Sequence, residues 1–216
     1  KDIIYRLAET SDVFVQNFRY GVARKLRVDY ETLKKYNPLL IYANCTGYGT
    51  KGKQASQAAL DPAIHAASGM MLGIGEADMP PIHLPGAISD QITGIMLAYA
   101  IMVGLYCKET KGVGQEIDVS MLGTMIWVQT NNIIATLLTK KSRERQVRAK
   151  APITLVKHYR CRDDKWIHLS HFQPHKYWPI LCRALSLTDI QDDPRFNTLK
   201  ARVDICAELI AILDRT

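Results

Sequence analysis

Hydrophobic positions in the first part of the chain follow two patterns, helical spacing and short continuous runs. Apolar side chains recur at helical spacing within 1–8, and the runs 13–15 and 39–43 are continuously apolar. Such runs are typical of strands buried on both faces of a parallel sheet. A second helix is predicted over 29–36, before Asn37-Pro38. The order helix, strand, helix, strand predicts an α/β fold with a parallel sheet.

This sheet is expected to be incomplete. The first helix has no preceding strand from which to cross over, so we expect the N-terminal part of the domain to lie outside this sequence. Further along, a helix rich in small residues is predicted over 60–72, a half-buried strand over 115–119 and a long helix over 121–138.

The pattern changes in the last third of the chain. Two alternating segments, 158–161 and 166–169, flank Asp163-Asp164 and predict a hairpin. Helices over 176–187 and 198–213 complete a small α+β domain. The predicted organisation is therefore a large domain over 1–121, a linker helix with a basic linker over 122–150, and the small domain over 151–216.

Composition is that of an ordinary globular protein, with 47% hydrophobic and 23% charged residues. The five cysteines are scattered without a CxxC pair, which indicates reduced thiols in the cytoplasm rather than a disulfide framework or a zinc ribbon. Cys45 and Cys107 lie in apolar settings that would raise their thiol pKa, unlike a nucleophile. The apolar run from Ile92 to Cys107 is shorter than the ~20 residues that cross a bilayer, so we expect a buried core helix there.

Positive charge is concentrated in one segment. The chain has a net charge of +7, and residues 140–165 carry that whole excess. A solvated linker face is the favoured interpretation, and a surface for nucleic acid or phosphate-bearing molecules is the alternative.

Asp90 is the first candidate for chemistry. It lies where a glycine-bearing loop meets the start of the apolar helix, and free backbone N–H groups there favour an ionised carboxylate, which can act as a nucleophile. From the local sequence alone, an ordinary N-cap is the preferred interpretation.

The histidines do not predict a metal site. His158 and His168 fall in facing strands of the hairpin, and His171 and His175 are separated by a proline that breaks any helix aligning them. No cysteines or paired carboxylates complete a ligand set. His65, on the helix of small residues, is expected to pack or to form hydrogen bonds rather than to catalyse.

Several stretches, in order along nearly the whole chain, resemble the family III CoA transferases. This group includes formyl-CoA transferase and carnitine CoA transferase, with α-methylacyl-CoA racemase as a relative. The stretches are 12–21 (DVFVQNFRYG), 37–42 (NPLLIY), 46–49 (TGYG), 61–69, 89–94, 111–122 and, in the small domain, 192–196 with 201–203.

The resemblance implies a Rossmann-like large domain with a parallel sheet, incomplete here, and a small α+β domain. It also implies an interlocked homodimer that acts on an acyl-CoA and a small carboxylic acid. Coenzyme A would be a substrate rather than a permanently bound cofactor, and neither a membrane nor a nucleic acid would be a partner. Members of the family are much longer than this chain.

By this resemblance Asp90 matches the catalytic aspartate of the family, which reverses the preference for an N-cap. Its carboxylate would form an anhydride and then an aspartyl-CoA thioester, with nearby backbone N–H groups stabilising the oxyanion. The predicted CoA contacts are Asn17, Phe18, Arg19 and Lys25, with Leu60 and Asp61 near the pantetheine arm.

Two positions bear on the reaction and the substrate. The racemase branch carries a histidine where this chain has Leu60, so we favour CoA transfer over racemisation, with His65 one turn further along as the reservation. Relatives place a glycine-rich loop of the small domain over the aspartate. The corresponding segment here, Ser170-His171-Phe172-Gln173, has no glycine and is expected to shape a different acid pocket.

Overall fold

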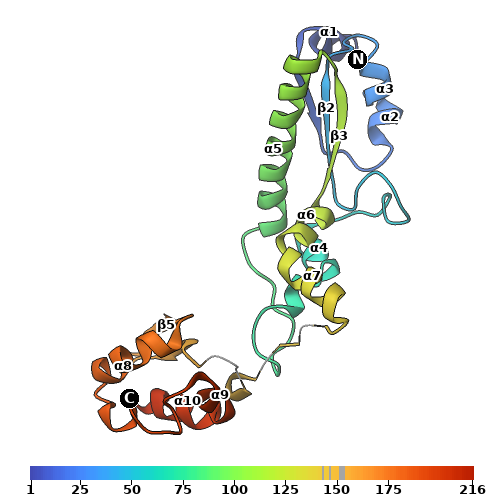
Figure 1. The fold of residues 1–216 in the computed structure, drawn as a ribbon. Coiled ribbons are helices and arrows are strands. Elements are labelled where there is room, and N and C mark those ends of the chain that lie inside the picture. The colour runs from blue at the N-terminus through green and yellow to red at the C-terminus, as the bar shows by residue number, and fades with distance from the viewer. Residues whose placement is uncertain (143, 146, 151–153) are drawn as a thin grey trace. The chain divides into compact units, whose positions relative to one another are not determined.

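The computed structural model describes residues 1–142, 144–145, 147–150 and 154–216 (Figure 1). The chain forms two compact units. The first comprises residues 1–75 and 80–143, and the second comprises 76–79 and 144–216. Each unit is described by itself.

A parallel sheet organises the first unit. Its described strands are β1 (Val13–Gln16), β2 (Ile41–Thr46) and β3 (Gln115–Ser120), in the order β1-β2-β3. Val13 pairs with Ile41, and Ile41 pairs with Gln115 in turn, all in parallel register. The predicted α/β fold with a parallel sheet is therefore confirmed.

Helices cover this sheet and continue beyond it. They are α1 (Asp2–Thr10), α2 (Val22–Leu26), α3 (Tyr30–Leu33), α4 (Asp61–Ala67), the 3-10 turn η1 (Met70–Leu72), α5 (Ile88–Lys111), α6 (Met121–Val128) and α7 (Thr130–Thr139). The helix predicted over 121–138 is divided at Gln129, and α2 was not predicted. The segment assigned to a linker, 122–150, thus includes α7 and most of α6 of the first unit.

The two faces of β2 pack against different elements because successive side chains of a strand point to opposite sides. Tyr42 belongs to a buried cluster with Ala8, Leu33 and Leu40. Ile41 faces α5 instead, where Gly104 lies close enough that a Cβ there would be 3.1 Å from its side chain. The sheet is therefore covered on both faces.

The long helix α5 differs from the buried core helix that the sequence predicted. Ile95, Tyr99, Met102 and Tyr106 are between 64% and 69% exposed, because only the face toward the sheet is covered by described residues. By length and composition alone, α5 is the one helix in the described ranges able to cross a membrane. Such a helix is weak evidence of a membrane location, and this one packs on β2 and β3.

The second unit is a small α+β arrangement. It contains an antiparallel hairpin of β4 (Val156–Arg160) and β5 (Trp166–Ser170), with η2 (Arg148–Lys150), α8 (Pro174–Ala184), η3 (Thr188–Ile190), α9 (Leu199–Asp204) and α10 (Cys206–Arg215). The hairpin was predicted, including the facing of His158 and His168. The helix predicted over 198–213 is divided at Ile205.

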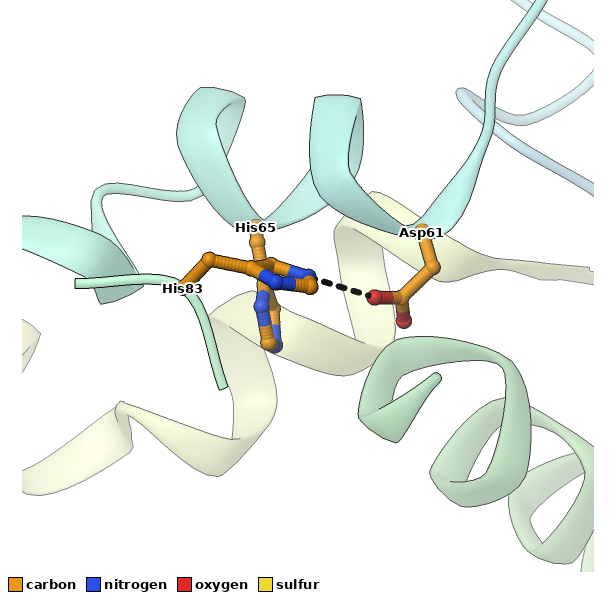
Figure 2. A group of neighbouring side chains, drawn as sticks. All are labelled: Asp61, His65 and His83. Carbon is orange, nitrogen blue, oxygen red and sulfur yellow. Dashed lines mark hydrogen bonds and ion pairs between the residues drawn. The ribbon is translucent and has the colours of Figure 1, made fainter. Parts of the chain in front are cut away.

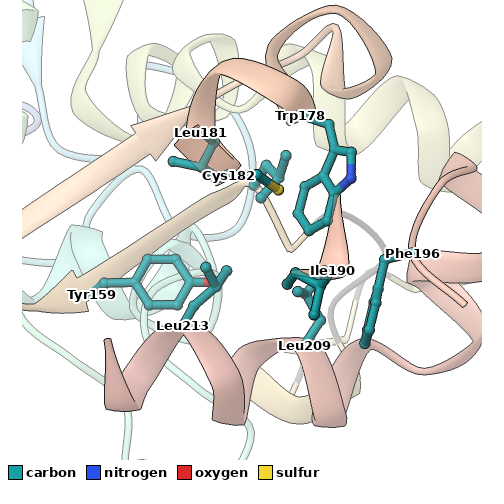
Figure 3. Close-up of a cluster of buried hydrophobic side chains, with 9 residues drawn as sticks. Tyr159, Trp178, Leu181, Cys182, Ile190, Phe196, Leu209 and Leu213 are labelled. Carbon is teal, nitrogen blue, oxygen red and sulfur yellow. The ribbon is translucent and has the colours of Figure 1, made fainter. Parts of the chain in front are cut away.

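The core of the second unit is aromatic and aliphatic (Figure 3). Trp178 and Phe196 lie near each other, and Tyr159 and Leu209 complete the contacts between hairpin and helices. The Trp178 indole N–H donates to the carbonyl of Gln191 at 2.9 Å, so its polar atom is satisfied inside the core. The second unit thus has its own hydrophobic core.

Close backbone packing at Gly114 gives a first prediction. A Cβ at this position would lie 2.3 Å from the Pro38 carbonyl oxygen, which is backbone and yields little. We expect Gly114→Ala to lower the free energy of unfolding by about 1–3 kcal/mol, measured by urea denaturation. Gly94→Ala is the matched control, because nothing lies within 4 Å of a Cβ there and alanine favours a helix by up to about 1 kcal/mol. Equal destabilisation by both changes would contradict the packing argument.

Candidate active site

Asp90 lies in the first turn of α5, at the end of the helix that points the same way as the carboxyl ends of the strands (Figure 1). Along the helix axis, Asp90 lies about 21 Å from Gly104. Along β2, Cys45 lies about 13 Å from Ile41. Since Gly104 packs on Ile41, the start of α5 extends past the end of β2. Ligands of open α/β sheets bind at this edge.

The side chain of Asp90 is exposed, and that of the preceding Ser89 is fully buried. The two residues therefore point in different directions from the same helical turn. Burial raises the pKa of the Cys45 thiol, and the negative charges of Asp90 and Asp118 raise it further. The raised thiol pKa expected for Cys45 agrees with this, and Asp90 lies within electrostatic reach of the end of β2.

The start of α5 is held by the carboxylate of Asp61, the first residue of α4. One oxygen, Oδ1, accepts a hydrogen bond from the Ser89 backbone N–H at 2.7 Å and another from the Ser89 hydroxyl. Asp61 is only 7% exposed. Burial would raise the pKa of this carboxyl, but the hydrogen bonds from Ser89 outweigh it and hold the pKa below its usual value. The buried carboxylate is therefore ionised at neutral pH.

This arrangement bears on two expectations about Asp90. The N-cap residue of α5 is Ala87, in a left-handed conformation, so Asp90 is not an ordinary N-cap. The backbone N–H of Ser89 donates to Asp61, so this amide is not free to stabilise an oxyanion. The capping carboxylate comes from a different helix.

The loop after β1 carries the other predicted contacts at the same edge of the sheet. Asn17, Phe18 and Arg19 are exposed, as is Lys25 on α2. The Phe18 backbone N–H donates to the side-chain oxygen of Gln16 at 2.7 Å, which fixes the start of this loop. The loop and α2 thus present one aromatic and two cationic side chains to solvent.

The loop after β2 is held by internal hydrogen bonds. The Gly49 backbone N–H donates to the Thr46 hydroxyl at 3.0 Å, and the Thr50 backbone N–H donates to the Asp118 carboxylate at 2.9 Å. These two amides are occupied, and a carboxylate beside them repels anions. They do not form a phosphate cradle.

Leu60 and Asp61 occupy different environments although they are adjacent. Leu60 is 75% exposed at the start of α4, whereas Asp61 is buried and bound to α5. Asp61 therefore has a structural contact with α5, and its predicted place near the pantetheine arm stays a prediction. His65, one turn along α4, is fully buried and contacts His83 edge-on, with ring centroids 5.3 Å apart.

A group missed by the sequence analysis consists of Asp61, His65 and His83, whose ligand-type atoms lie within 4.8 Å of one another (Figure 2). The available signal was the spacing of an aspartate and a histidine four residues apart on one predicted helix. The sequence did not indicate that His83 lies beside Asp61, because His83 belongs to an irregular loop with no periodic pattern.

The predicted segment of the small domain follows β5. Ser170, Phe172 and Gln173 are exposed, and the half-buried His171 ring stacks on Tyr177 with centroids 5.1 Å apart. α8 begins at Pro174, so His171 lies outside the helix that contains His175, as the proline predicted.

Several cations of the basic segment have partners within the second unit. Arg148 forms a bidentate ion pair with Asp214, with N–O distances of 2.6 and 2.7 Å, and its guanidinium lies over the Tyr159 ring. Arg145 donates to the carbonyl oxygens of Glu76 and Met79. These contacts favour a structural role for this part of the segment.

Comparison with known proteins gives one consistent result. The model of CoA-transferase family III matches residues 1–216. An acyl-CoA transferase of Fusarium pseudograminearum is 31% identical, covering 99% of this chain and 46% of that protein. A probable fatty acyl-CoA transferase of Mycobacterium tuberculosis is 30% identical over 99% of this chain and 56% of its own length.

A solved structure of a CaiB/BaiF family protein from Brucella suis has the same fold. It superposes with a TM-score of 0.87 at 31% identity, covering 99% of this chain and 56% of the other. The chain thus spans about half the length of the relatives it matches.

The cap of α5 gives a second prediction. Asp61→Ala would leave the buried N–H and hydroxyl of Ser89 without their acceptor, so we expect the free energy of unfolding to fall by about 1–3 kcal/mol. Asp12→Ala is the control, since it removes a carboxylate that is 75% exposed and paired with Lys108, at a cost below about 1 kcal/mol. Urea denaturation measures both, and similar losses would contradict the role assigned to Asp61.

Proposed function

Because the chain belongs to CoA-transferase family III, we propose that the whole protein transfers CoA between an acyl-CoA thioester and a free carboxylic acid, with Asp90 as the nucleophile. The observation that carries this proposal is the placement of Asp90, exposed at the start of α5 beyond the carboxyl end of β2 while Ser89 anchors the turn. The names of the relatives, acyl-CoA transferases of several kinds, support the reaction class.

The proposed reaction proceeds by exchange at two carbonyl groups. An oxygen of the Asp90 carboxylate attacks the thioester carbonyl carbon, the carbon–sulfur bond breaks, and CoA leaves as the thiolate. The thiolate then attacks the aspartyl carbonyl of the mixed anhydride and releases the first acid, which gives an aspartyl-CoA thioester. The acceptor carboxylate repeats these steps in reverse and restores Asp90. No proton, metal or electron carrier is consumed in this sequence.

CoA binding is assigned to the exposed side chains beside this edge. Arg19 and Lys25 would contact phosphates through charge-assisted hydrogen bonds, with Asn17 and Phe18 beside them. Leu60 offers an exposed apolar surface to the pantetheine arm, and Asp61 positions α5 from behind. Ser170, His171, Phe172 and Gln173 are proposed to line the pocket of the acid.

Racemisation is the alternative that this site supports less well. It needs a second base that reaches the α-carbon from the opposite face. Leu60 has no ionisable group, and His65 is fully buried. Exchange of the α-proton in deuterated water without CoA exchange would establish racemase activity and refute the proposed transferase activity.

The surroundings of the enzyme are proposed from the family. We propose a cytoplasmic homodimer without a membrane or nucleic-acid partner and without a permanently bound cofactor. The partners of Arg148 and Arg145 support the exclusion of nucleic acid from the basic segment.

The nucleophile gives a third prediction. In the complete protein, Asp90→Ala is expected to lower kcat for CoA exchange by at least about a thousandfold. Borohydride or hydroxylamine trapping during turnover, followed by mass spectrometry, should modify the peptide that contains Asp90. Asp78→Ala, a change at another exposed aspartate, should leave both readouts intact. Full CoA exchange in Asp90→Ala would refute the mechanism.

The CoA contacts give a fourth prediction. Arg19→Ala removes a charge-assisted contact worth about 1.5–3 kcal/mol, so KM for the acyl-CoA should rise about 10-fold to 100-fold with little change in kcat. Arg6→Ala on α1, before β1 rather than after it, is the matched control. An equal KM for the two variants would show that residues other than Arg19 bind the CoA phosphates.

A further inference from the structure

His65 is a buried polar side chain without an internal partner. It is fully buried, and neither Nδ1 nor Nε2 has a hydrogen-bond partner among the described residues. Leaving a buried polar group unsatisfied costs about 1–3 kcal/mol, so such a side chain calls for an explanation. A metal ion that accepts the lone pair of an imidazole nitrogen would give His65 the missing partner.

The neighbours of His65 form a ligand set around it (Figure 2). Asp61 and His65 are one turn apart on α4, a spacing that places both side chains on one face of the helix. His83 reaches the same point from the loop that precedes α5. Its Nε2 lies 3.4 Å from Asp61 Oδ2, which is about the separation of two ligands in a tetrahedron with bonds of about 2.1 Å.

The two oxygens of Asp61 divide between two tasks. Oδ1 accepts from Ser89, and Oδ2 faces the histidines. The hydrogen bonds from Ser89 orient the Asp61 carboxylate. Side chains that bind metal ions are ordinarily oriented by hydrogen bonds of this kind. Access is open from one side, because the His83 side chain is 42% exposed.

We propose that Asp61, His65 and His83 bind a divalent transition-metal ion, with Zn²⁺ as the probe. Two imidazole nitrogens and one carboxylate oxygen match the ligand preference of Zn²⁺, and the fourth position is left for water on the side of His83. Binding draws His83 and His65 closer to the ion than they lie here, and it joins the loop before α5 to α4. The ion takes no part in the CoA-transfer chemistry assigned to Asp90, although Asp61 belongs to both arrangements.

The test is Zn²⁺ binding to metal-stripped protein, measured by competition with a chromophoric chelator. We expect one ion per chain, and we expect His83→Ala to raise the Kd at least about tenfold, since even residues behind the ligands contribute 10- to 100-fold to affinity. His83 is partly exposed, so its removal should leave the fold intact. Co²⁺ bound to the wild-type protein should show the visible absorption of a tetrahedral site, which His83→Ala should abolish.

His158→Ala is the matched control. It removes an exposed imidazole that faces His168 across the hairpin in the second unit, and it should leave Zn²⁺ affinity unchanged. Three results would overturn the proposal: no binding by the wild-type protein, equal affinity in His83→Ala, or a loss in His158→Ala as large as that in His83→Ala. CoA exchange by the complete protein is measured separately, so failure of one proposal does not imply failure of the other.

Discussion

The carboxylate of Asp61 decides where α5 begins and which way its first side chains point. Through Ser89 it joins the starts of α4 and α5, two helices that are distant in the sequence. With Ser89 turned inward, Asp90 faces solvent. The exposure of Asp90 is therefore a consequence of a buried hydrogen bond rather than of a flexible loop. A rigid turn of this kind positions a reactive group better than a mobile segment does.

Local patterns were sufficient to predict the strands and their type. Continuous apolar runs such as 39–43 identified the parallel sheet, and turn residues at 163–164 identified the hairpin with His158 opposite His168. The helix breaks at Gln129 and Ile205 were not predicted, because apolar spacing continues across both positions. Periodicity reports which side chains face a core, and it is insensitive to a local interruption that leaves this facing unchanged.

The candidate site was less predictable because its contacts connect distant parts of the chain. Local sequence favoured an N-cap role for Asp90, yet the capping carboxylate is Asp61, on another helix. Nothing near Asp61 or His83 in the sequence indicates that they meet. The local sequence identified Asp90 as a candidate, but only the family motif favoured it as the nucleophile, since its exposure depends on Ser89 and on a partner from α4. Which side chains of the first turn of α5 are buried depends on tertiary contacts, so local sequence does not predict it.

The cap also constrains how the proposed chemistry is assisted. An uncapped helix start offers free amides and the positive end of the helix dipole to a developing oxyanion. Here the amide of Ser89 donates to Asp61, and the first turn of α5 faces two carboxylates, those of Asp61 and Asp90. An oxyanion formed at Asp90 must therefore be stabilised by donors other than the Ser89 amide.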